Sequence, residues 1–175
     1  MIKTVAAIVA VLAAAVLALA AFKPDTFHVQ RSISIKAPPA KIFALIDNFR
    51  NWDAWSPWEK LDPALKRTFS GAASGTGAVY EWEGNRKVGS GRMEITESSP
   101  SSKIVIKLDF IKPLEGHNVA EFTLEEQGDS TRVTWTMHGP APFISKVIQV
   151  FLSMDAMIGQ NFETGLENMK TVAER

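Results

Sequence analysis

The chain has 175 residues, 46% of them hydrophobic and 22% charged, a composition that suits one globular core of ordinary make-up. Nineteen basic residues balance nineteen acidic ones, so the excess positive charge expected of a nucleic-acid-binding protein is absent. The chain has no cysteine, which excludes disulfides, thiolate metal sites and cysteine nucleophiles.

The first predicted element is an apolar helix near the N-terminus. Residues 4–22 contain no charged side chain and are flanked by Lys3 and Lys23. As a helix they would be about 28 Å long, at ~1.5 Å per residue, which is close to the ~30 Å hydrocarbon core of a bilayer. We therefore predict a single-pass membrane anchor at residues 1–23 and one domain at residues 24–175.

A cleavable signal peptide is the alternative for this segment, because Ala18-Leu19-Ala20 has the small-x-small form of a cleavage site. The apolar run exceeds the roughly 7–15 residues usual for a signal peptide, and this favours a retained anchor. No polar face interrupts the run, which argues against a buried helix of the domain. The short head before the segment resembles a signal anchor, so we expect the domain to lie outside the cytoplasm.

The residues after the anchor predict a strand and then a short helix. Val29, Ile33 and Ile35 alternate with polar residues, the pattern of a half-buried strand. Pro38 and Pro39 end the strand and can open a helix. The apolar positions of that helix are Ile42, Phe43, Leu45 and Ile46.

The next segment, NWDAWSPWEK at residues 51–60, contains three of the five tryptophans. Trp52 and Trp55 are three residues apart and can pack together in a helical turn, whereas Trp58 lies beyond Pro57 and can point elsewhere. Three roles remain open for this loop: core packing at the open end of a sheet, a gate to a cavity, and contact with a bilayer surface.

From about Lys66 the pattern has a period of two residues, which predicts a run of antiparallel strands with one apolar, covered face. Gly84-Asn85 and Gly128-Asp129 predict tight hairpin turns. Gly89 and Gly91 remove side chains from the inward face, and they either leave room for a cavity or mark bulges. By parity, the bulky inward residues are Tyr80, Trp82, Met93, Phe110, Phe122, Trp135 and Met137.

Residues 143–175 predict one long helix of about 50 Å, with Gly159 and Gly165 as positions where it can bend. Its apolar stripe includes Phe151 and is predicted to cover the sheet. A strand, one or two short helices, antiparallel strands and a long terminal helix together predict an α+β domain whose curved sheet wraps a helix.

The order of these elements and several of their motifs resemble the START-like (Bet v 1-like) helix-grip superfamily, most closely its polyketide cyclase/dehydrase-type branch, the SRPBCC proteins. The motifs are VxRSIxIxAP at 29–38, WxxWSPW at 52–58, GxGAxYxW at 75–82, VGxGxMxI at 88–95, TxVxW at 131–135 and GLxxMK at 165–170. The resemblance implies a mostly apolar cavity between the sheet and the long helix. It also implies a hydrophobic ligand such as a lipid, sterol or polyketide, although some members are enzymes.

Motifs of catalysis or metal binding are absent from the sequence. The three histidines, His28, His117 and His138, are not spaced as metal ligands, and the Gly-x-Gly pairs lack the third glycine of a dinucleotide fingerprint. Parity places Arg31 and Tyr80 inward. Parity does not fix the direction of three acidic residues: Asp53, Glu59 and Asp155. It sends outward the glutamates Glu81, Glu83, Glu94, Glu121 and Glu125.

We therefore expect a membrane-anchored binding protein for a hydrophobic, lipid-like small molecule, with no catalytic residue, metal or cofactor and with its protein partners undetermined. The predicted cavity residues are Trp52, Trp55, Trp58, Tyr80, Trp82, Met93, Phe110, Phe122, Trp135, Met137 and Phe151. One alternative is a cyclase or dehydrase, which needs an inward acid or base. Another is a protein-interaction module like the Hsp90-activator relatives of this fold, which would use the outward charged face.

Overall fold

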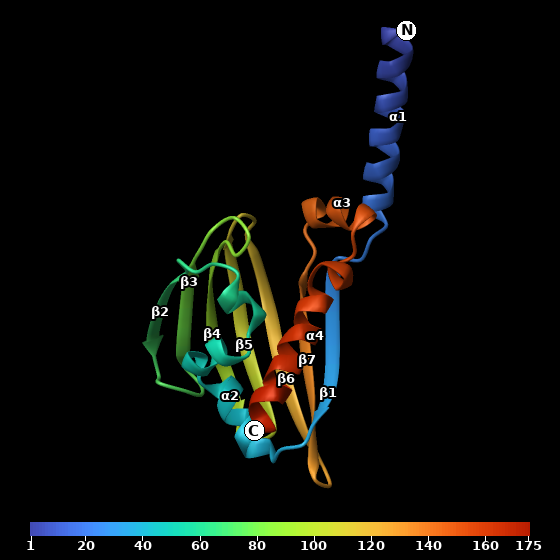
Figure 1. Cartoon of the computed structure of the whole chain (residues 1–175). Coiled ribbons are helices and arrows are strands. Elements are labelled where there is room, and N and C mark those ends of the chain that lie inside the picture. Colours follow the sequence, from blue (N-terminus) through green and yellow to red (C-terminus); the bar gives the residue numbers. More distant parts are fainter.

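The computed structural model describes all 175 residues, and its N-terminal helix projects from one end of the domain that contains every other element (Figure 1). This helix, α1 (Ile2–Ala21), is long and apolar enough to cross a membrane, and almost its whole surface is exposed. A four-residue linker, residues 22–25, joins it to the first strand.

The domain is built on one antiparallel sheet of seven strands in the order β1-β7-β6-β5-β4-β3-β2. Strands β2 to β7 form a meander, and β1 closes the other edge by pairing with β7. The strands are β1 (Thr26–Ile35), β2 (Lys66–Gly71), β3 (Ala78–Glu83), β4 (Ser90–Ser99), β5 (Lys103–Lys112), β6 (Gly116–Gln127) and β7 (Ser130–Pro140).

The sheet has one covered face, as the period-two pattern predicts. In β7, Val133, Trp135 and Met137 are buried, while the residues between them are at least partly exposed. In β6, Phe122 is buried opposite Trp135, and the two rings stack with centroids 4.8 Å apart. Burial of each such side chain contributes roughly 1.5–3 kcal/mol to folding. The α+β helix-grip prediction is therefore confirmed.

Helices close the concave face of the sheet. Helix α4 (Met154–Ala173) runs along the concave side, and α2 (Pro39–Asp47) lies near one end of the sheet (Figure 1). The short 3-10 helices η1 (Phe49–Ala54) and η2 (Pro57–Lys60) connect α2 to the sheet. The buried stripe of α4 contains Phe162, Leu166, Met169 and Ala173.

The prediction of one helix over residues 143–175 is wrong, because α3 (Phe143–Phe151) and α4 are separate. Leu152 has an extended backbone between them, and the Ser153 side chain accepts a hydrogen bond from the Ala156 amide, 3.1 Å away. Serine favours this N-cap position over a helix interior. As a result, α3 leaves the sheet and packs against α1.

Gly159 and Gly165, the positions where a bend was expected, both lie inside the continuous helix α4. Each glycine admits a neighbouring side chain. A Cβ at Gly159 would collide with the Arg31 guanidinium, and one at Gly165 would lie 2.9 Å from Cζ3 of Trp135. Both positions are therefore close approaches of α4 to the sheet.

Of the two predicted hairpin turns, one is confirmed. Gly128 and Asp129 form a two-residue turn between the paired residues Gln127 and Ser130. The β3–β4 connection is longer than predicted and runs from Gly84 to Gly89, which has a left-handed φ of 67°. This longer loop contributes to the site described below.

Candidate ligand-binding site

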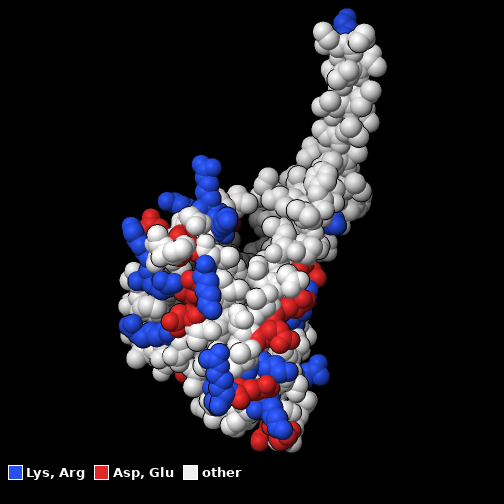
Figure 2. Space-filling model, in the orientation of Figure 1, with Lys and Arg blue, Asp and Glu red and all other residues white.

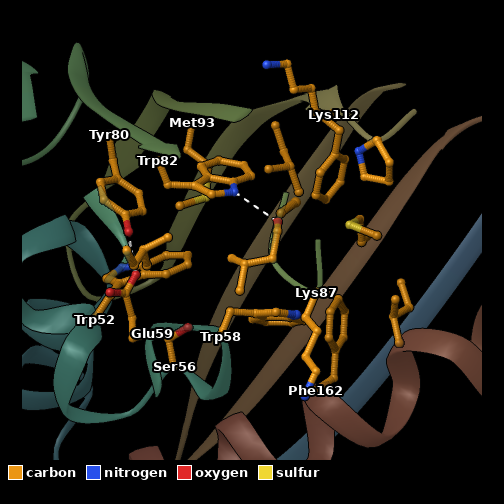
Figure 3. A pocket seen from close by; sticks show the side chains of 18 of the residues that line it. Trp52, Ser56, Trp58, Glu59, Tyr80, Trp82, Lys87, Met93, Lys112 and Phe162 are labelled. Atoms are coloured by element: carbon orange, nitrogen blue, oxygen red, sulfur yellow. Dashed lines mark hydrogen bonds between the residues drawn. The ribbon is translucent and has the colours of Figure 1, made fainter. Parts of the chain in front are cut away.

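A cavity of about 320 Å³ lies between the concave sheet, the η1–η2 segment and α4. Fifteen of its 21 lining residues are hydrophobic, so most of its wall is apolar (Figure 3). The volume is near the lower end of the ~300–1,000 Å³ typical of small-molecule sites. The wall therefore suits a compact apolar molecule.

Two of the three loop tryptophans tie the end of α2 to the core. Trp52 and Trp55 are buried, with their ring centroids 4.7 Å apart. Their indole N–H groups donate to the backbone oxygens of Ile46 and Leu45, both at 2.9 Å. The last carbonyls of a helix have no partner within the helix, and these bonds satisfy two of them.

The third tryptophan of the loop, Trp58, is half-buried and lines the cavity. Its ring meets those of Trp135 and Phe162 edge-on, with centroids 5.7 Å and 6.1 Å away. Pro57 separates it from the other two, as the sequence indicates. In this loop, Trp55 serves core packing alone, Trp58 lines the cavity, and Trp52 is buried in the core and also reaches the lining.

One end of the cavity is polar and is centred on Glu59, whose side chain is 7% exposed. Its carboxylate accepts a hydrogen bond from the Tyr80 hydroxyl at 2.6 Å and one from Arg67 Nε at 2.5 Å. Burial and the neighbouring carboxylate raise the pKa of Tyr80 above its ordinary value. Tyr80 therefore stays a neutral donor at physiological pH, and the carboxylate already has two partners.

The other end of the cavity is open and basic. Arg86 and Lys87 in the β3–β4 loop and Lys112 at the end of β5 line it, and all three are exposed. None of the three is within 4.0 Å of a carboxylate oxygen, unlike their neighbours Lys66, Arg92 and Lys107. Figure 2 shows basic side chains beside a hollow at the end of the domain nearest α1.

The basic loop is held in place by hydrogen bonds to its surroundings. The Trp82 indole N–H donates to the backbone oxygen of Val88 at 3.3 Å (Figure 3), and the Asn85 amide donates to the Asp62 carboxylate at 2.7 Å. The Gly84 amide donates to the backbone oxygen of Gly89 at 2.8 Å. Arg86 and Lys87 therefore project from a loop that is hydrogen-bonded to its surroundings.

Eight of the predicted cavity residues belong to the lining. They are Trp52, Trp58, Tyr80, Trp82, Met93, Phe110, Trp135 and Met137.

Three predicted residues lie elsewhere. Trp55 and Phe122 are wholly buried behind the lining, with ring centroids 6.0 Å apart in an edge-on contact. Phe151 is 71% exposed at the end of α3, since the break at Leu152 and Ser153 turns that helix away from the sheet.

The inward glycine Gly91 does not leave open space in the cavity. Gly91 pairs with Trp82 across the strands, and a Cβ at Gly91 would collide with the Trp82 ring. The space left by the glycine is filled by this indole, which itself lines the cavity. The β4–β5 register shifts between Ser90 and Gly91, in agreement with the bulge alternative.

Sequence reasoning missed the polar end and the basic end. Glu59 lies on a 3-10 turn and Arg86 and Lys87 lie on a loop, where strand parity gives no direction, whereas Lys112 is the last residue of β5 and shares the parity of Phe110. Ile158 and Phe162 of α4 also line the cavity, and their helical stripe was the only signal for them. Arg31 is inward but is bound to Asp155 and Glu163 of α4.

The structure contains no group of three or more His, Asp or Glu side chains that could hold a metal ion. Asp53 is exposed and is not part of the lining. Among the acidic residues whose direction the sequence leaves open, only Glu59 faces the cavity.

Solved structures of low sequence identity share this fold. The di-domain ARO/CYC BexL of the BE-7585A biosynthetic pathway has a TM-score of 0.64 at 16% identity, over 91% of this chain and 53% of BexL. The Aha1 dimer of Colwellia psychrerythraea has a TM-score of 0.58 at 19% identity, over 85% and 96%. Protein CV1439 of Chromobacterium violaceum has a TM-score of 0.59 at 13% identity, over 87% and 99%.

No curated protein sequence matches the chain. A sequence model of the family described as "Polyketide cyclase / dehydrase and lipid transport" matches residues 26–174, from the start of β1 to the end of α4. Because this match spans the whole domain, the chain belongs to that polyketide cyclase/dehydrase and lipid transport family, which is of the Bet v 1-like, SRPBCC type.

Proposed function

We propose that the protein is a membrane-anchored binding protein for a small hydrophobic, lipid-like molecule. Residues 1–23 are the anchor, residues 24–175 are the binding domain, and the domain lies outside the cytoplasm. The observation that carries the proposal is the apolar cavity, which opens at the end of the domain nearest α1. Transfer of apolar surface from water into such a wall is favourable by roughly 25 cal/mol per Å².

The polarity of the cavity supports an amphiphilic ligand. The apolar middle, lined by Trp82, Phe110 and Phe162, would hold a chain or a ring system. The cations at the open end would favour an anionic head group there, since opposite charges attract across a partly desolvated site. The small volume favours a single-chain or few-ring molecule over a two-chain phospholipid.

The anchor is supported by the surface of α1. Valine, leucine and isoleucine side chains are exposed all round this helix, with no packing partner along most of its length. An apolar helix of this length reaches across the hydrocarbon core of a bilayer. Only its last turns, next to α3, meet the rest of the protein.

The test is to purify the full chain in lipid nanodiscs and to identify small molecules that copurify by mass spectrometry. We expect a stoichiometric apolar molecule that is lost in Ala120→Phe, a variant that fills the cavity from its wall. Ala44→Phe, at an exposed site on α2, is the matched control and should retain it. A folded wild-type chain that carries and captures no apolar molecule would contradict the proposal.

A cyclase or dehydrase reaction is the second candidate, and Glu59 is the observation that favours it. Its carboxylate faces the cavity and could accept a proton from a bound substrate. The bonds from Tyr80 and Arg67 occupy both of its oxygens. Catalysis through Glu59 requires that Glu59→Gln abolish turnover of a polyketide substrate while leaving ligand binding intact; equal turnover by the variant would exclude this role.

A further inference from the structure

Exposed apolar side chains of the domain gather at the end next to α1. Outside residues 1–21, all the large apolar side chains that are exposed, except Leu61, belong to the linker, the end of β5 and the loop after it, α3 and the residue after it, or the start of α4, which lie together at this end (Figure 1). They are Phe22, Ile111, Leu114, Phe143, Ile144, Phe151, Leu152 and Met157. A cluster of this kind on one surface indicates a contact with another apolar phase.

Helix α3 has no charged residue on its free surface. Its only charged residue, Lys146, is buried and forms an ion pair with Asp25 of the linker. Phe143, Ile144 and Phe151 are exposed on the rest of the helix. A helix with one apolar face lies stably in the interface of a bilayer, with that face among the acyl chains.

The same contacts fix the domain close to the end of α1. Lys146 binds Asp25, and the Ala141 amide donates to the Asp25 backbone oxygen at 2.7 Å. Helix α3 packs on α1 itself. The apolar surface of α3 therefore continues the apolar surface of α1, and it lies at the level where a bilayer around α1 would end.

The charges beside this surface are those of the cavity mouth. Arg86, Lys87 and Lys112, the basic rim, have no carboxylate partner, and Lys23 follows α1. The one acidic side chain in the β5–β6 loop, Glu115, is 3.4 Å from Nε2 of His117. Cations near a membrane surface are attracted to anionic lipid head groups, by about fivefold in binding for each Lys or Arg.

We propose that α3 and the basic rim dock on the anionic head groups of the bilayer that holds α1. The cavity mouth then opens directly onto the leaflet, and an amphiphile passes between leaflet and cavity without crossing water. Charge complementarity and continuity with α1 favour a bilayer over a second copy of the chain as the partner of this surface. The inference rests on the proposed function for its anchor and its ligand.

The test uses the full chain in vesicles and takes advantage of its lack of cysteine. Single cysteines are introduced as Leu114→Cys beside the rim and as Gln127→Cys at the far end of β6, and each is labelled with a fluorophore. Vesicles of phosphatidylcholine, with or without phosphatidylglycerol, carry a quencher in their acyl chains. We expect strong quenching at position 114 only, and more of it with the anionic lipid.

The rim variant Arg86→Gln/Lys87→Gln/Lys112→Gln should lower the equilibrium constant for docking on anionic vesicles on the order of 100-fold. Its control, Lys41→Gln/Arg132→Gln/Arg175→Gln, removes the same charge from exposed sites outside the rim and should dock like the wild type. Phe143→Ser/Phe151→Ser should weaken docking on both kinds of vesicle.

Equal quenching at positions 114 and 127 would overturn the docking proposal. Quenching that depends on the ratio of protein to lipid, and not on lipid charge, would also overturn it, because a second copy would then cover the surface. Copurified ligand is measured on the same samples. A chain that holds its ligand but does not dock disproves docking alone, whereas a chain that docks but never holds a ligand disproves the proposed function.

Discussion

The Trp135 ring lies parallel to that of Phe162, with centroids 4.1 Å apart and an angle of 5° between the planes. This stack joins the centre of the sheet to α4, and both residues line the cavity. Gly165, one turn further along α4, lets the helix approach the edge of the same indole. Attachment of the helix and shaping of the ligand site therefore depend on the same two rings.

Phe162→Ala should destabilise the domain by about 3–5 kcal/mol, because Phe162 is 2% exposed and its loss removes the stack and leaves a void. The measurement is denaturant unfolding of the full chain in micelles. Phe151→Ala, at an exposed phenylalanine, is the control and should change stability by less than about 0.5 kcal/mol. Similar losses in the two variants would contradict the packing described for α4.

Trp55→Phe and Trp58→Phe should have different effects. The first removes the N–H that binds the backbone oxygen of Leu45 and should cost about 1–3 kcal/mol of stability, because that oxygen is left without a partner. The second removes an indole whose contacts face the cavity, so it should change ligand retention more than stability. The free energy of unfolding and the rate of ligand release, measured on both variants, distinguish a role in core packing from a role in ligand retention.

The strand pattern predicted the sheet well because parity follows directly from backbone geometry. Val133, Trp135 and Met137 alternate with polar residues, and all three lie on the covered face. The same rule predicts an inward direction for Trp82 and Phe110, and both residues line the cavity. It could not show that Phe122 is sealed behind other rings, since burial and lining look alike in a two-residue period.

The helix pattern did not predict the break between α3 and α4, because a hydrogen bond of one side chain, Ser153, caps the start of α4. The apolar spacing continues from Phe143 through Phe162, so nothing in the period marks the break at Ser153. The cap depends on a hydrogen bond of the Ser153 hydroxyl, and serine is also common at exposed helical positions. Phe151 was misplaced for this reason. Its true position, on an apolar surface beside α1, is what motivates the docking proposal.

Titration of Tyr80 should reveal the contact with Glu59. Burial and the carboxylate raise the pKa of Tyr80, so the folded state holds the phenol proton more tightly than the unfolded chain does. This contribution to stability is complete below about pH 10, the ordinary pKa of tyrosine, and is lost as the pH rises towards the pKa of the folded state.

The measurement is ultraviolet absorbance of the phenolate against pH, which is specific because Tyr80 is the only tyrosine. Glu59→Gln should lower the pKa of Tyr80 but leave it above the ordinary value, since burial remains. Glu83→Gln, at an exposed glutamate of β3, is the control and should leave the titration unchanged. An unchanged pKa in Glu59→Gln would show that the carboxylate does not act on the phenol.

Arg31→Lys should loosen the first half of α4. Arg31 donates to both oxygens of Asp155 at 2.6 Å and 3.0 Å and to Glu163 at 2.5 Å, and lysine cannot supply this fork of donors. We expect faster amide hydrogen exchange around Ile158, with little change around Met169, and faster ligand release because Ile158 lines the cavity. Arg132→Lys, at an exposed arginine without a salt bridge, is the control. An equal rise in exchange along all of α4 would indicate general destabilisation and would contradict a local effect of Arg31 on the first half of the helix.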